Sequence, residues 1–178
     1  MSGVALPDGF RFEPLERRHP RRRFDCGQRQ VTDWLRTKAL QSQQKRLSAT
    51  KVLLDPGGAI AGFCTLATGQ VDFGDLPPEL ARQLPRRALP VAVLAWLGAN
   101  QAHQKQGLGK LLLAQALRDC HDAGRTFAFI AVILDCIDDA AKAFYEQWDF
   151  AALPGHPYRL VLGAKLLAAM MDDRGHSG

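Results

Sequence analysis

Two glycines in the middle of the chain lie where a buried strand is expected to give way to a helix. Gly107 and Gly109 follow the polar residues 100–106, and the leucines after them recur at helical spacing. The first turn of a helix presents unpaired N–H groups and the positive end of the helix dipole, and glycine lets a bulky anion approach the backbone. This arrangement predicts a binding site for a diphosphate group.

The spacing differs from two common phosphate-binding motifs. Only one residue separates Gly107 from Gly109, and no Ser or Thr follows Lys110, which excludes GxxxxGK[ST]. Leu112 takes the place of the third glycine in GxGxxG. A strand–helix turn without a ligand can carry the same glycines. The spacing Gln104-x-x-Gly107-x-Gly109, between a strand and a helix, favours the anion site.

The second half of the chain supplies alternating strands and helices around this segment. Continuous apolar runs predict buried strands, and stripes of apolar residues predict helices, which together imply a mixed sheet with crossover helices. The expected elements are a strand over Val91–Leu97, a helix over Leu108–Ala123, a strand over Phe127–Leu134, a helix over Asp139–Trp148 and a strand over Tyr158–Leu162.

The first half has a strand, a helix, a hairpin and a loop. The hairpin is indicated by two apolar, partly β-branched runs on either side of Asp55-Pro56-Gly57-Gly58. Four prolines predict the loop, which has room for one short helix. The expected ranges are Phe10–Leu15 for the first strand, Gln28–Lys45 for the helix, Ala49–Leu54 and Ile60–Thr68 for the hairpin, and Asp75–Pro90 for the loop.

Length and composition predict one globular domain over residues 1–178, with the last eight or so residues as a flexible tail. The chain has 178 residues, 47% of them hydrophobic and 23% charged. No apolar run reaches the roughly 18–20 residues of a membrane-spanning helix, and no signal core is present, so we expect a cytoplasmic protein. The four cysteines are widely spaced without a CxxC pair, and we expect no metal.

The positive charge is concentrated near the N-terminus. Of a net charge of +5, residues 1–50 carry eleven Lys or Arg against five Asp or Glu, and the cluster Arg17–Arg23 contributes most of this excess. Clustered cations favour a polyanionic partner through counterion release. A solvated arginine-rich loop is an equally good interpretation of the charge alone.

The glycine segment resembles the acetyl-CoA signature [Gln/Arg]-x-x-Gly-x-[Gly/Ala] of the GNAT N-acetyltransferases. The resemblance implies an α/β (α+β) fold, in which helices flank a mixed, mostly antiparallel sheet and a splayed parallel strand pair holds acetyl-CoA. It implies that the amides of Gln106, Gly107, Leu108, Gly109 and Lys110 hold the diphosphate, in the segment that begins with Gln104 and Lys105. It also implies that the strand end Leu97-Gly98-Ala99 pairs with pantetheine and supplies an oxyanion donor.

A tyrosine farther along the chain is the candidate general acid. Phe144-Tyr145-Glu146 resembles the family's [Phe/Leu]-Tyr-[Glu/Lys] element. A phenol, with a pKa of about 10, is protonated at neutral pH and can donate to the departing thiolate. We therefore predict that Tyr145 is catalytic, whereas on an isolated helix it would be interpreted as a packing residue.

Several motifs in order resemble more narrowly the GNAT toxins of bacterial toxin–antitoxin pairs. They are Phe12-Glu13-Pro14-Leu15, Phe24-Asp25-Cys26-Gly27, Trp34-Leu35, Pro85-Arg86-Arg87-x-Leu89-Pro90-Val91 and Phe144-Tyr145-Glu146. The resemblance implies acetylation of the α-amine of aminoacyl-tRNA, inhibition of translation, a ribbon-helix-helix antitoxin and a homodimer. It suggests tRNA contacts by Lys45, Arg46, Arg86 and Arg87, and a weaker contribution from Arg17–Arg23.

Two departures from the family pattern keep alternatives open. Trp96 replaces an arginine that is frequent before the strand end, and Asp149 replaces the glycine of a Gly-Phe pair. The alternatives are an acetyltransferase that acts on a small amine or a protein N-terminus, and a non-catalytic acetyl-CoA-binding interaction domain. The basic N-terminal third favours the tRNA interpretation over the first alternative, and Trp96 and Asp149 are the only support for the second.

Overall fold

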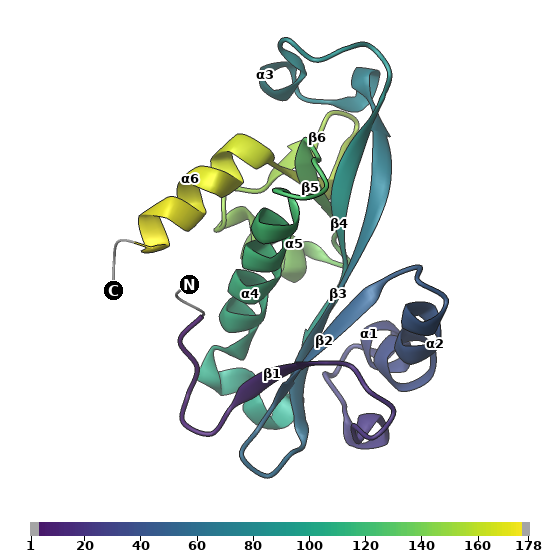
Figure 1. Cartoon of the computed structure of the whole chain (residues 1–178), viewed down its shortest axis with the longest axis vertical. Coiled ribbons are helices and arrows are strands. Elements are labelled where there is room, and N and C mark those ends of the chain that lie inside the picture. Colours follow the sequence, from purple (N-terminus) through teal and green to yellow (C-terminus); the bar gives the residue numbers. More distant parts are fainter. Residues whose placement is uncertain (1–3, 176–178) are drawn as a thin grey trace. The chain divides into compact units, whose positions relative to one another are not determined.

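The computed structural model describes residues 4–175, which divide into two compact units. The first unit comprises Met1–Ala67 and Leu94–Leu117, and the second comprises Thr68–Val93 and Arg118–Gly178. Hydrogen bonds join the strands into a seven-stranded sheet in the order β1-β2-β3-β4-β5-β7-β6. The predicted mixed, mostly antiparallel sheet with flanking helices is confirmed (Figure 1).

The first unit contains three antiparallel strands with helices on both faces (Figure 1). Strand β2 is buried on both sides, because Val52 and Leu54 pack with α1 and α2 while Leu53 packs with α4. Its elements are β1 (Arg11–Pro14), η1 (Arg21–Arg23), α1 (Arg29–Asp33), η2 (Trp34–Lys38), α2 (Ala39–Gln44), β2 (Ala49–Leu54), the start of β3 (Ile60–Asp72), the end of β4 (Ala88–Ala99), η4 (Gln101–Gln106) and most of α4 (Leu108–Ala123).

The second unit is built on the parallel pair β4–β5, in which Ala92 and Val93 lie opposite Val132 and Ile133. Strand β7 adds antiparallel to β5 on its other side, and β6 pairs with β7. A core of aliphatic residues from β3, β4, β5 and β7 holds these strands together. The remaining elements are η3 (Phe73–Asp75), α3 (Pro78–Ala81), β5 (Ala131–Asp135), α5 (Asp139–Glu146), β6 (Ala151–Leu153), β7 (His156–Gly163) and α6 (Ala164–Gly175).

The helix predicted over Gln28–Lys45 forms, but its middle is a π-helical turn, η2. The Thr37 hydroxyl donates to the carbonyl oxygen of Asp33 at 2.7 Å, which competes with the regular helical bond. The amide of Ala39 donates to Trp34 instead, five residues back. Trp34 is the first residue of η2.

Several predicted boundaries differ from the structure. Strand β3 continues to Asp72 rather than ending at Thr68, and β4 spans Ala88–Ala99 rather than Val91–Leu97. Strand β5 begins at Ala131 rather than Phe127, because Thr126 and Phe127 donate to Ala123 in the turn that ends α4. The predicted tail is helical as far as Gly175, since α6 buries Leu167 and Met171. Residues 176–178 of the predicted tail lie outside the described residues. Within residues 4–175, no helix combines the length and the apolar character needed to cross a bilayer.

A buried histidine stabilises the turn between β1 and η1. The Nδ1 atom of His19 accepts a hydrogen bond from the amide of Glu16 at 2.9 Å, and its Nε2 lies 3.8 Å from Oε1 of Glu13. Burial lowers the pKa of His19 below its ordinary value of 6.5, and the charge of Arg18 acts in the same direction. His19 is therefore neutral in the folded protein at neutral pH.

Acidification is expected to destabilise the protein through His19. The unfolded chain binds the proton more readily than the folded chain, so the free energy of unfolding falls as the pH decreases below 6.5. The His19→Asn variant keeps an acceptor for the amide of Glu16, and asparagine does not titrate. Its free energy of unfolding should therefore fall less between the two pH values. Urea unfolding at pH 7.5 and 5.5 measures both, and an equal fall in the two proteins would contradict this role.

Candidate active site

The end of β4 is held between two groups of side chains within the first unit. Leu97 and Ala99 pack towards α4, whereas Gly98 faces the other side of the strand. A Cβ atom on Gly98 would lie 2.8 Å from Cγ1 of Val31, which is closer than real Cβ contacts. Immediately after the strand, the amide of Asn100 donates to the carbonyl oxygen of Ala61 at 2.8 Å. This end of β4 is thus fixed in position and requires glycine.

The predicted diphosphate segment forms a short turn followed by a helix, as expected. The side chain of Asn100 caps η4 by accepting from the amide of Ala102 at 3.1 Å. Gly107 ends η4 with a left-handed backbone, φ +70°, and α4 begins at Leu108. Leu108 and Leu112 are fully buried and anchor the start of this helix against β2 and β3.

The residues around Gly107 fit a diphosphate. Nothing lies within 4 Å of the position that a Cβ atom on Gly107 would occupy, so the backbone is open to a ligand. The first amides of a helix have no partner within the helix and carry its positive dipole. Lys110 is exposed in the same turn and adds a cation. For Gln104 and Lys105 the structure describes the backbone turn alone, so their predicted contribution stays a prediction.

The segment Phe24–Gly27 packs beside this strand end. The carbonyl oxygen of Asp25 accepts from the amide of Gln101 at 2.8 Å, and Cys26 lies next to Gly98. Gly27 has φ +84° and leaves room for the Gln101 side chain, whose Nε2 would be 2.5 Å from a Cβ atom there. The segment therefore joins the start of α1 to the turn between β4 and η4.

Trp96 forms an aromatic pair with Trp34 on the face of β4 that packs with α1 and α2. The two rings are stacked, with centroids 5.2 Å apart and an interplanar angle of 13°. The indole nitrogen of Trp34 donates to Oγ1 of Thr65 at 3.0 Å, and Thr65 shares a 2.7 Å hydrogen bond with Thr50. The tryptophan that replaces the family's arginine is therefore a half-buried packing residue with a defined ring orientation.

Tyr145 lies in the second unit, near the C-terminus of α5. This helix begins as predicted at the cap residue Asp138, whose carboxylate accepts from the amide of Ala141 at 2.8 Å. The Tyr145 ring is half-buried and makes edge contacts with Phe144 and Phe150 at centroid distances of 5.1 and 5.9 Å. These contacts orient the phenol, and its role as general acid stays a prediction.

The turn after α5 contains the second departure from the family pattern. Asp149 has φ +67°, in the left-handed region that glycine adopts without strain. Its amide donates to Glu146 at 3.2 Å, and the amide of Trp148 donates to the carbonyl oxygen of Tyr145 at 2.9 Å. The backbone geometry expected of the family's glycine is therefore kept, and it is adopted by an aspartate.

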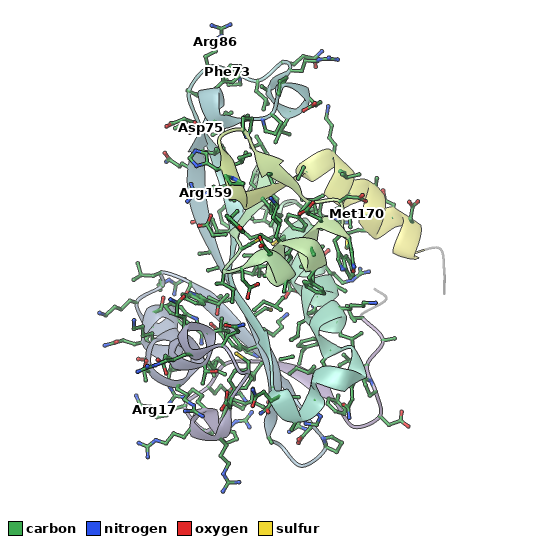
Figure 2. The ribbon with its side chains drawn as sticks, turned by 180° about the vertical axis from the view of Figure 1, so that it is seen from behind. Arg17, Phe73, Asp75, Arg86, Arg159 and Met170 are labelled. Atoms are coloured by element: carbon green, nitrogen blue, oxygen red, sulfur yellow. The ribbon has the colours of Figure 1, made fainter. Side chains whose placement is uncertain are left out.

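The basic residues predicted to contact tRNA are exposed in both units. In the first unit, Lys45 and Arg46 follow α2, and Arg46 has a left-handed backbone with φ +61°. In the second unit, Arg86 and Arg87 lie in the loop before β4, where Arg86 stacks over the Phe73 ring at 5.7 Å (Figure 2). The described structure supports their accessibility, and their contact with tRNA stays a prediction.

The Arg17–Arg23 cluster is exposed in part. Arg17, Arg22 and Arg23 are exposed. Arg18 is also exposed, but it makes ion pairs with Glu13 and Glu16, which neutralise part of the cluster's charge. Four of the five arginines are therefore exposed, and one of these four is already paired with carboxylates.

The cysteines have the properties of structural residues. Cys26, Cys64 and Cys120 are buried. Burial raises the pKa of Cys120 to about 12 and that of Cys136 to about 11, so both remain thiols at neutral pH. The described residues hold no cluster of three potential metal ligands.

Comparison with known families identifies the chemistry. The model of the acetyltransferase (GNAT) family matches residues 12–150, which span the strand end, the glycine segment and Tyr145. The protein belongs to the GNAT acetyltransferase family. It is thus an N-acetyltransferase whose co-substrate is acetyl-CoA, and the predicted family, fold class and enzyme class are confirmed.

Individual relatives of this GNAT protein include bacterial toxins. It is 32% identical to the tRNA-acetylating toxin of Mycobacterium tuberculosis over 84% of this chain and 89% of that protein. It is similar in fold to AtaT complexed with acetyl-methionyl-tRNAfMet (TM-score 0.84, 21% identity, 91% of this chain and 99% of that chain). It is also similar to a mutant of AtaT bound to the C-terminus of the antitoxin AtaR and acetyl-CoA (TM-score 0.78, 20% identity, 92% and 99%).

Adding one methyl group at Gly98 should destabilise the protein. Gly98→Ala places a Cβ atom against the stiff Val31 side chain, and we expect a loss of about 1–3 kcal/mol in the free energy of unfolding. Gly74→Ala is the matched control, because nothing lies within 4 Å of a Cβ atom there. Urea denaturation gives both values, and equal midpoints would show that the strand end can relax around the methyl group.

The left-handed backbone at Asp149 predicts an ordering of variants. Asp149→Gly removes the steric cost and should be at least as stable as the natural protein. Asp149→Ala keeps that cost without a polar side chain and should be about 1 kcal/mol less stable than Asp149→Gly. Thermal unfolding of the three proteins checks this order, and an alanine variant as stable as the glycine variant would contradict it.

Proposed function

We propose that this GNAT protein is a toxin that acetylates the α-amine of aminoacyl-tRNA and thereby blocks translation. The observation that carries the proposal is the similarity to a tRNA-acetylating toxin over more than four fifths of both chains. An excess of six positive charges in residues 1–50 supports an acceptor that carries phosphates.

On the coenzyme side, the main contacts are made by backbone groups. When bound, acetyl-CoA supplies an acetyl group activated as a thioester. The amides of residues 106–110 hold its diphosphate, with the left-handed Gly107 leaving the approach open. Gln104 and Lys105 belong to the same segment and complete the predicted site. The amides of Leu97, Gly98 and Ala99 pair with the pantetheine arm and provide an oxyanion donor.

On the chemical side, little beyond positioning is required of the protein. The α-amine must be neutral and aligned, and alignment can account for a large share of the rate enhancement. The Oη atom of Tyr145 holds the proton that a thiolate leaving group needs, because a phenol is protonated at neutral pH. The edge contacts with Phe144 and Phe150 restrict the ring that carries this proton.

The tRNA is held mainly through its phosphates. Lys45, Arg46, Arg86 and Arg87 provide exposed cations for this purpose, and Arg17, Arg22 and Arg23 add a weaker contribution. Binding of this kind weakens steeply as the salt concentration rises. Charged tRNA is the substrate of translation, so we place the reaction in the cytoplasm.

We also propose an antitoxin partner and a homodimer. A toxin of similar fold is bound to the C-terminus of its antitoxin, and by analogy this protein is neutralised by a small ribbon-helix-helix antitoxin. A reading frame for such a protein beside the gene would support this part, and size-exclusion chromatography with light scattering tests the dimer.

Replacing Tyr145 by phenylalanine separates catalysis from binding. Tyr145→Phe removes the proton donor but keeps the ring and its contacts, so growth inhibition and transfer of labelled acetyl to charged tRNA should be lost. Coenzyme A binding, measured by calorimetry, should change less than about twofold, because the diphosphate contacts lie elsewhere in the chain. Tyr158→Phe is the matched control, since Tyr158 is exposed and bonds to Asp139.

The same assay distinguishes the other functions. Transfer of acetyl to a polyamine or a peptide N-terminus, without transfer to charged tRNA, would replace the proposed acceptor. Coenzyme binding without transfer to any amine would instead indicate an interaction domain. Full toxicity of the Tyr145→Phe variant would contradict the role of the phenol.

A further inference from the structure

His103 lies in η4, four residues before Gly107, and connects two segments that are distant in the sequence. Its Nε2 is 3.5 Å from Oδ2 of Asp55, and its Nδ1 is 3.2 Å from Oε1 of Gln106. The side chains of His103 and Asp55 are only 21% and 18% exposed, so water competes weakly for the contact between them, whereas the contact with Gln106 is exposed.

Asp55 is itself fixed in the turn of the β2–β3 hairpin. Its Oδ1 accepts from the amide of Ala59 at 3.0 Å, and its own amide donates to the carbonyl oxygen of Ala59 at 2.9 Å. One carboxylate oxygen therefore closes the hairpin turn, and the other faces His103. Asp55 thus gives the imidazole a rigid partner.

The N-terminal segment supports the same turn from another side. The Phe10 ring contacts the His103 ring edge-on at 5.8 Å. Gly9, with φ +80°, lies directly against Pro56, which would be 2.9 Å from a Cβ atom on that glycine. The imidazole is therefore held by the hairpin turn, by Phe10 and by the side chain of Gln106.

We propose that Asp55 and His103 are positioning residues for coenzyme A. They hold Gln106, and with it the amides around Gly107, in the conformation that binds the diphosphate. A six-residue 3₁₀ turn has weak hydrogen bonds of its own, so an external anchor reduces the cost of ordering it on binding. This inference rests on the proposed diphosphate site at Gly107 and is independent of the acceptor.

Two variants remove the anchor with little change in shape. Asp55→Asn keeps an oxygen for the amide of Ala59 but removes the charge that faces His103. His103→Phe keeps a ring against Phe10 but removes both polar contacts. We expect each variant to weaken coenzyme A binding about three- to tenfold in titration calorimetry. The affinity of the double variant should equal that of the single variant that binds less tightly, because the two residues act as one unit.

Kinetics and matched controls separate positioning from general stability. The KM for acetyl-CoA should rise by the same factor, whereas kcat and the KM for the acceptor should stay within about twofold. Asp72→Asn and His156→Phe alter exposed residues of the same types and should leave coenzyme A binding unchanged. Thermal unfolding without ligand reports any loss of stability separately.

Each other outcome has a defined meaning. Wild-type protein that binds no coenzyme A would overturn the diphosphate site itself. Wild-type protein that binds, with both variants binding equally well, would overturn the role of the pair, including the case in which only the unfolding temperature falls. Additive losses in the double variant would show that the two residues act independently, which also contradicts the inference.

Discussion

The contact on which the rest of the site depends is the one we propose between backbone amides at the start of α4 and a diphosphate. Such a contact needs an open backbone, supplied by the left-handed Gly107, and a helix start that does not move. The buried Leu108 and Leu112 anchor the helix, and Asn100 fixes the end of β4. These side chains take no part in the proposed reaction. They fix the position of the few backbone amides that would bind the diphosphate.

The two units contribute different parts of the proposed reaction. The first carries the glycine segment, the end of β4, the Phe24–Gly27 segment and the stacked tryptophans. The second carries Tyr145 on α5. Each unit also has a residue with a left-handed backbone in its part of the proposed site. This residue is Gly107 in the first unit and Asp149, after the helix that carries Tyr145, in the second. This pattern is expected where a site needs a fixed geometry that regular secondary structure does not provide.

Sequence patterns were most informative where one strong local signal decided the outcome. The leucine stripe predicted α4 residue for residue, and the Asp-Pro-Gly-Gly turn located the hairpin. The start of β5 was misplaced because Phe127 belongs to the turn ending α4, and the three residues of β6 are too few to form a pattern. The helix α6 had a signal in Leu167 and Met171, four residues apart. The Asp55–His103 contact joins residues 48 positions apart, so no local pattern could indicate it.

The most direct measurement is a crystal structure of the protein with acetyl-CoA. The account predicts diphosphate oxygens within hydrogen-bond distance of amides from Gln106 to Lys110, and the coenzyme sulfur beside the hydroxyl of Tyr145. A diphosphate bound elsewhere, or a Tyr145 ring directed away from the sulfur, would contradict it.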